Sequence, residues 1–140
     1  MRDRMPAKSS TAVRAGATAE PGTLVLVSLA AWLVPGAGHF WLGRRQKAVV
    51  FFCALVAMFV IGLMLEGRLF PFEASEPLVF LEAVANIGLG LPWMLARMVD
   101  AGQGTVTAVT YEYGNAFLLV AGLLNFLVIL DAVDVAMGRK

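Results

Sequence analysis

The chain has 140 residues, of which 59% are hydrophobic and only 15% are charged. Soluble domains carry about 25% charged residues, so this composition and a mean hydropathy of +0.77 exclude an ordinary soluble fold. Eleven basic and ten acidic residues give a net charge of +1, which excludes a nucleic-acid-binding surface built on bulk positive charge.

The chain starts with a polar tail and an interrupted apolar segment. Residues 1–22 are small and polar without apolar periodicity, which predicts a disordered tail. Residues 23–42 predict a first helix, but its apolar run, Leu24–Val34, covers only about 16 Å. Continued past Pro35 and Gly36, the segment reaches about 30 Å, one hydrocarbon thickness. It is therefore a kinked span or a re-entrant half-helix. We favour the span, because re-entrant backbone must be buried in protein.

The remaining apolar segments also have membrane-spanning length. The predicted helices cover residues 23–42, 48–65, 78–99 and 115–137. The second is uncharged and holds the only cysteine, Cys53, so no internal disulfide is possible. Pro92 predicts a kink in the third helix. We predict an all-α integral membrane protein whose single domain, residues 23–138, packs about four transmembrane helices as two hairpins.

A secretory signal peptide is the alternative interpretation of the N-terminus. A basic region, an eleven-residue apolar core and the small pair Ala37-Gly38 resemble one. We favour a retained helix, because the basic region is long, the apolar core contains Trp32, and Pro35 follows it directly.

Loop charges predict the orientation. The last three helices put the 43–47 turn and the 100–114 loop on one side, and the 66–77 loop and the C-terminus on the other. If the first helix spans, the tail joins the C-terminus and basic residues divide seven against four. If it re-enters, the tail joins the 43–47 turn and they divide eight against three. With a spanning helix, the positive-inside rule predicts both termini in the cytoplasm.

The turn after the first helix, VPGAGHFWLGRRQK (Val34–Lys47), combines small, aromatic and basic residues. Its glycines permit unusual backbone conformations and close helix approach. Its aromatic side chains are interfacial anchors, and its basic residues face lipid headgroups. The candidate structural residues here are Pro35, Gly36, Gly38, His39, Phe40, Trp41, Gly43, Arg44 and Arg45.

This turn resembles the signature of the two-transmembrane-helix domain family. Gly38-His39-Phe40 stands for the family's Asp-Arg-Phe or His-Arg-Phe type triplet, and Trp41 replaces the usual Tyr before Leu42-Gly43. The Arg of the triplet is absent. The resemblance covers under a third of the chain and implies an architecture but no enzymatic activity.

The rest of the chain resembles bacterial multi-helix membrane proteins of unknown function, which implies a bacterial inner-membrane location. The segments that carry this resemblance are Gly88–Pro92, Glu112–Gly114, Ala121–Asn125 and Ile129–Ala132.

His39 is the only histidine. A catalytic or proton-relay role would need a nearby carboxylate, which Asp100 or Glu112 on the same predicted side could supply. We favour a turn histidine bonded to a backbone carbonyl. One histidine without clustered ligands predicts no metal site, and nothing in the sequence predicts a cofactor.

The third helix carries a polar face, formed by Glu82, Asn86, Gly90, Trp93 and Arg97 at helical spacing. Glu82 lies near one end and reaches the interface. Asn86 is deeper, and we expect it to face Asn125 of the fourth helix. We favour a role in joining helices over a transport path.

Asp131 and Asp134 lie near the C-terminal end of the fourth helix, where negative charge is mildly unfavourable. The predicted topology places them beside Arg68, away from Arg44 and Arg45. We therefore expect an ion pair with Arg68 or with a partner subunit. A cation site shared with Glu82 is the alternative.

Together these features predict a non-enzymatic membrane protein that acts as a scaffold, an assembly factor or an accessory subunit. A small oligomeric transporter or channel using Glu82, Asn86 and Asn125 is the second hypothesis. A membrane enzyme based on His39 is the third. The expected partners are the lipid bilayer and either another membrane protein or further copies of the chain.

Overall fold

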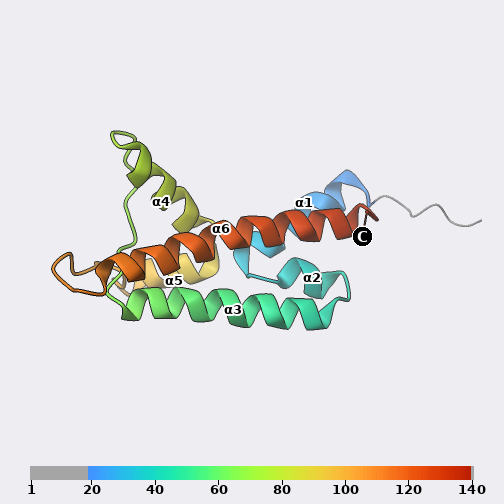
Figure 1. Cartoon of the computed structure of the whole chain (residues 1–140). Coiled ribbons are helices and arrows are strands. Elements are labelled where there is room, and N and C mark those ends of the chain that lie inside the picture. The colour runs from blue at the N-terminus through green and yellow to red at the C-terminus, as the bar shows by residue number, and fades with distance from the viewer. Residues whose placement is uncertain (1–18, 140) are drawn as a thin grey trace, which may run out of the picture.

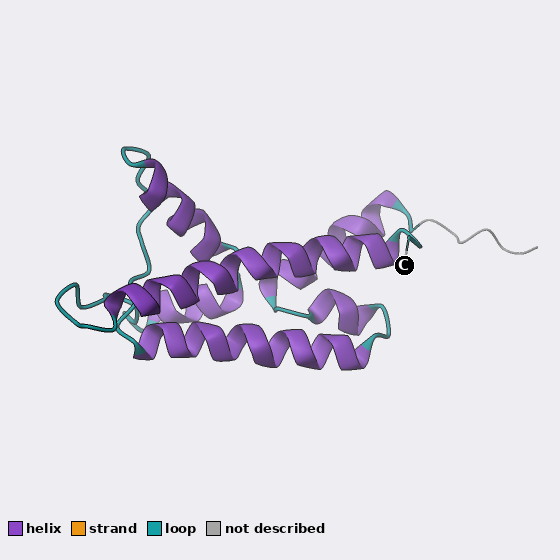
Figure 2. Ribbon diagram, viewed as in Figure 1, coloured by secondary structure: helices purple, strands orange, loops and turns teal. Residues whose placement is uncertain are grey.

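The computed structural model describes residues 19–139, and this part of the chain is α-helical (Figures 1 and 2). Most of the predicted tail lies outside it. The helices are α1 (Pro21–Leu33), α2 (Ala37–Trp41), α3 (Arg45–Met64), α4 (Pro77–Ile87), α5 (Leu91–Met98) and α6 (Tyr111–Ala136). The predicted all-α fold is confirmed.

Two long helices, α3 and α6, form the body of the molecule and lie side by side (Figure 1). Both have long apolar runs and neither contains proline, so nothing interrupts them. They are antiparallel, because Gly62 near the end of α3 meets Gly114 and Leu118 near the start of α6. Both are long and apolar enough to cross a membrane.

The predicted first helix is two helices joined at Pro35-Gly36. Val34 before the proline is extended. Gly36 has φ +84°, and a Cβ there would lie 2.5 Å from the carbonyl oxygen of Ala48. Gly38 of α2 then packs back against Ala31 of α1. The sequence correctly predicted a break here, but the kinked span that we favoured is wrong, because the chain reverses.

The predicted third helix is also two helices. α4 and α5 are separated at Gly88–Gly90 and are bent by 103° relative to each other. Gly90 has φ +59°, a left-handed conformation that favours glycine. Pro92 lies in the first turn of α5, where proline is compatible with a helix. The predicted kink is therefore a full interruption. The described residues contain two candidate spans, or three if α4 and α5 form one, in place of four.

The two ends of the bundle hold different segments. At one end, Leu69 donates a backbone hydrogen bond to Gly102 (2.8 Å), and Thr105 donates to Glu66 (3.2 Å). We call this the loop end. At the other end, Leu24 near the start of α1 packs with Ala132 and Ala136 of α6. This end also holds the 43–47 turn, and we call it the turn end.

Two short helical hairpins therefore enter the bundle from opposite ends. The α1–α2 hairpin starts and finishes at the turn end, whereas α4 slants in toward α6 from outside the bundle and α5 then runs back to the loop end (Figure 1). Both pack on α6, whose buried residues Leu118, Ala121 and Val128 belong to the main hydrophobic core with Leu55 and Phe59 of α3.

Candidate functional site

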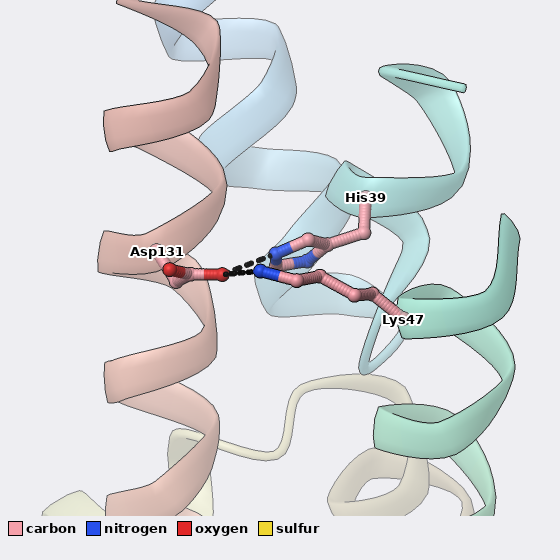
Figure 3. Close-up of polar contacts among 3 residues, drawn as sticks. All are labelled: His39, Lys47 and Asp131. Atoms are coloured by element: carbon pink, nitrogen blue, oxygen red, sulfur yellow. Dashed lines mark hydrogen bonds and ion pairs between the residues drawn. The ribbon is translucent and has the colours of Figure 1, made fainter. Parts of the chain in front are cut away.

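A partly buried cluster of polar side chains lies at the turn end, where α2, α3 and α6 meet (Figure 3). His39 Nε2 donates a hydrogen bond of 2.7 Å to Asp131 Oδ2. Lys47 Nζ lies 3.4 Å from the same oxygen. The side chain of His39 is 0% exposed, that of Asp131 18% and that of Lys47 44%. One carboxylate thus joins a buried imidazole to a half-exposed ammonium.

The chain reversal at Pro35-Gly36 creates this cluster. It turns α2 back toward the turn end, so that His39 faces the last turns of α6. α3 then starts at Arg45, which places Lys47 in its first turn beside the same carboxylate. The surrounding packing is close, because Gly38 leaves room only for Ala31 and Ala132.

The predicted pairings of His39 with Asp100 or Glu112, and of Asp131 with Arg68, were wrong. Asp100 and Glu112 lie at the loop end, away from His39. Arg68 also lies there, and its backbone N–H donates to Asn115 Oδ1 (2.8 Å). Asn115 and Asp131 are sixteen residues apart on α6, so Arg68 is about 24 Å from Asp131 along the helix.

The other face of the His39 ring is apolar. Phe51 of α3 contacts it edge to face at 5.0 Å between ring centroids. Nδ1 is buried and has no hydrogen-bond partner among the described residues. The backbone carbonyl bond predicted for this histidine is therefore replaced by the carboxylate of Asp131. The ring is a buried structural contact, with no face open to a substrate.

A second polar site lies where the tips of the two hairpins meet. Trp32 Nε1 of α1 donates to the carbonyl of Ile87 at the end of α4 (2.9 Å). Asn125 Nδ2 of α6 donates to the carbonyl of Gly88 (2.7 Å) and lies 3.5 Å from that of Ala31. These carbonyls lie at interrupted helix ends, where the regular helical donors are missing, and that of Ile87 also accepts from the backbone N–H of Gly90 (3.0 Å). The side chains of Trp32 and Asn125 satisfy them.

Close backbone packing completes this junction. A Cβ at Gly90 would lie 2.1 Å from the carbonyl oxygen of Trp32, and one at Gly122 would lie 1.8 Å from that of Ala85. Backbone therefore contacts backbone both between the hairpin tips and between α4 and α6. We call this region, formed by Trp32, Ile87–Gly90, Gly122 and Asn125, the tip junction.

The polar residues of the predicted stripe occupy different environments. Asn86 is buried, but the expected amide bond with Asn125 is absent, because the Oδ1 atoms of both residues have no partner among the described residues. Glu82 lies on α4, on the loop-end side of the tip junction, remote from Asp131 and Asp134. Within residues 19–139, no three His, Cys, Asp or Glu side chains are grouped so as to hold a metal ion.

The remaining predicted residues of the turn lie at the surface. Phe40 and Trp41 are exposed on α2, and the guanidinium of Arg45 lies over the Phe40 ring at 6.0 Å. Gly43 has φ +79° between α2 and α3. Arg44 is the residue before α3. The last predicted residue, Asp134 of α6, lies outside the turn and 3.5 Å from Arg139 in an exposed ion pair.

The sequence interpretation missed two residues of these polar sites, Trp32 and Lys47. Lys47 had been grouped with headgroup-facing residues, and only its position one turn into α3 could have indicated an intramolecular partner. Trp32 had been counted as an apolar residue of the first span, although a buried indole N–H normally requires an acceptor.

Together, the composition and the two or three apolar helices of spanning length indicate a multi-pass α-helical membrane protein. A family model of unknown function, DUF6677, matches residues 26–140, and the chain belongs to this family. No match was found among curated proteins or among solved structures.

Proposed function

We propose that this protein is a non-enzymatic integral membrane protein that acts through contacts with other membrane proteins, as an assembly factor or accessory subunit. The observation that carries the proposal is the closed tip junction. The side-chain N–H donors of Trp32 and Asn125 bond to helix-end carbonyls there. The hairpin tips meet backbone to backbone at Gly90. An interior packed in this way offers no path for a substrate, so we expect the protein to act through contacts at its outer surface.

The buried cluster supports the non-enzymatic part of the proposal. A general base must come within hydrogen-bond reach of the proton that it removes. His39 is fully buried, and its Nε2 is bonded to Asp131. The cluster holds α2 and α3 against α6.

The experiment is native mass measurement of the tagged protein after mild-detergent extraction from its own membranes. We expect stoichiometric migration with other membrane proteins. Asn86→Leu is the control variant for a role of this buried polar residue, because its Oδ1 makes no hydrogen bond in the described residues. The variant should retain the partners. A uniform species containing only copies of the 15 kDa chain contradicts the proposal.

A small oligomeric transporter is the second candidate, and two observations favour it. Interrupted helices that meet within the membrane are a feature of transporters. The buried Oδ1 atoms of Asn86 and Asn125 are acceptors without partners among the described residues. In this case the protein would form a homo-oligomer, and Asn86→Leu would abolish flux in vesicles while leaving the oligomer intact.

We further propose a cell-membrane location, in the inner membrane of a bacterium, with both termini in the cytoplasm. Among the described basic residues, Arg44, Arg45, Lys47 and Arg139 lie at the turn end, and Arg68 and Arg97 lie at the loop end. The sequence adds four basic residues before Ala19 and one after Arg139. The positive-inside rule then favours a cytoplasmic turn end.

Cysteine labelling tests the arrangement of the two ends. In a Cys53→Ser background, we expect Gln46→Cys and Arg139→Cys to react with an impermeant maleimide from one side of the membrane, and Gln103→Cys from the other. All three positions are exposed. Four spanning helices would instead put residues 46 and 103 on the same side. That labelling pattern contradicts the re-entrant arrangement of α4 and α5, because a spanning α4–α5 pair also places residues 46 and 103 on one side.

A further inference from the structure

An apolar groove runs along the outer face of the molecule between α3 and α6. Its volume is about 600 Å³, within the range of about 300–1,000 Å³ typical of ligand pockets. Its walls are apolar side chains of both helices, including Val50, Ala54, Leu124 and Leu127. The buried Leu55 and Val128 also line it.

One end of this groove is charged. Asp131 and Asp134 line it there, and Lys47 lies 3.4 Å from Asp131. Asp134 is 38% exposed, and Arg139 is its partner at 3.5 Å. Carboxylates and basic groups therefore occur together where the apolar walls stop, so a ligand with charges of both signs is complementary to this end.

The length of the groove favours a lipid acyl chain over a protein helix as its occupant. From Leu124 to Asp134 the groove follows ten residues of α6, or about 15 Å. That is half of the roughly 30 Å hydrocarbon thickness, the depth of one leaflet. Its charged end is at the turn end, close to where α6 stops at Ala136. A partner helix would use the whole depth, whereas an acyl chain below its headgroup uses one leaflet.

We propose that this groove binds a zwitterionic phospholipid with a primary amine in its headgroup. One acyl chain lies between α3 and α6. The ammonium group donates to Asp134, and the phosphate accepts from Lys47, whose three N–H groups are not all used by Asp131. The proposal depends on the membrane location and is independent of whether the protein serves as an accessory subunit or a transporter.

The test is native mass spectrometry of the full chain after exchange into detergent with defined lipids. The probes are phosphatidylethanolamine, phosphatidylcholine, which lacks ammonium N–H donors, and phosphatidylglycerol, which lacks the ammonium group. We expect one phosphatidylethanolamine per chain, bound about tenfold more tightly than the others, as one charged hydrogen bond predicts. Equal retention of the three lipids overturns the proposal.

Two variants test the contributions of the charged end and of the apolar groove to lipid binding separately. Asp134→Asn should remove the preference for phosphatidylethanolamine and leave the weaker binding of phosphatidylglycerol unchanged. Ala54→Trp should fill the groove and abolish binding of all three lipids. Ala57→Trp is the matched control, because Ala57 is also exposed on α3 but does not line the groove.

A folding control and two further results decide whether the groove is the lipid site. The Asp134→Asn and Ala54→Trp proteins should elute from a sizing column like the wild type, which shows that lost binding is not lost folding. If Ala54→Trp still binds lipid, the groove is not the site. If the wild type is a dimer that binds no lipid and Ala54→Trp makes it monomeric, a second copy occupies the groove and the proposal fails.

Discussion

Gly122→Ala should destabilise the folded protein by about 3 kcal/mol or more, above the usual cost of an overpacked core. The new methyl group would lie 1.8 Å from the carbonyl oxygen of Ala85 and 2.4 Å from its carbonyl carbon. Both atoms belong to helix backbone, so neither can move aside as a side chain does. Separating α4 from α6 would also strain the bond from Asn125 to Gly88. The free energy of unfolding is measured by denaturant titration in detergent, followed by circular dichroism.

Gly22→Ala provides the control for this substitution. Gly22 lies in the first turn of α1, and a Cβ there meets no atom within 4 Å. Alanine is also the better helix former by about 1 kcal/mol, so this variant should be neutral or slightly stabilised. Equal stability of the Gly122→Ala and Gly22→Ala proteins would contradict the contact between α4 and α6.

Asp131→Ala should have the second-largest effect, a loss of about 1.5–3 kcal/mol, the usual range for a hydrogen bond to a charged group. The substitution leaves the Nε2 proton of the fully buried His39 without its acceptor and removes the partner of Lys47. Asp134→Ala is the matched control on the same helix. Its ion pair with Arg139 is exposed, and such pairs contribute about 0.2–1 kcal/mol.

A double-mutant cycle distinguishes this pairing from the one that the sequence favoured. Asp131→Ala combined with His39→Ala should be less destabilising than the sum of the single changes, because the two residues share one interaction. Combined with Arg68→Ala, it should be additive, because Arg68 is remote. Additivity with His39→Ala, or coupling with Arg68→Ala, would refute the cluster.

The sequence predicted where the chain stays helical and where it breaks. The uninterrupted apolar runs that form α3 and α6 carry a direct signal. Pro35-Gly36 and Gly88–Pro92 carry another, because proline lacks a donor and glycine accepts positive φ. Those signals are local properties of a few residues, and for that reason they can be detected without a fold.

The direction of the chain after each break could not be predicted. A proline and a glycine permit a kink or a reversal equally well, and the choice depends on what the next segment packs against. Here Gly38 fits against Ala132 of α6, more than ninety residues away in the sequence. Treating the third helix as one continuous span through the second break, at Gly88–Pro92, placed the 43–47 turn beside the 100–114 loop and the C-terminus beside the 66–77 loop. The error assigned Asp131 to Arg68 and His39 to Asp100 or Glu112.

The turn motif is accounted for by packing. Gly36 and Gly38 each lie against backbone or Cβ atoms of neighbouring helices, and His39 is held by Asp131. These contacts give a physical reason for small residues before the histidine. The resemblance of this turn to the two-transmembrane-helix domain family remains a prediction, as do the roles that it implies.

The dependence of both hairpins on α6 has a consequence for biosynthesis. α6 packs against α1, α2, α3 and α4, yet it follows all of them in the sequence, so the ribosome makes it after them. Until it emerges, the carbonyls at the ends of α1 and α4 lack Asn125 as a donor, and exposed backbone is costly in lipid. We therefore expect α1, α2 and α4 to reach their final packing only after α6 has been made.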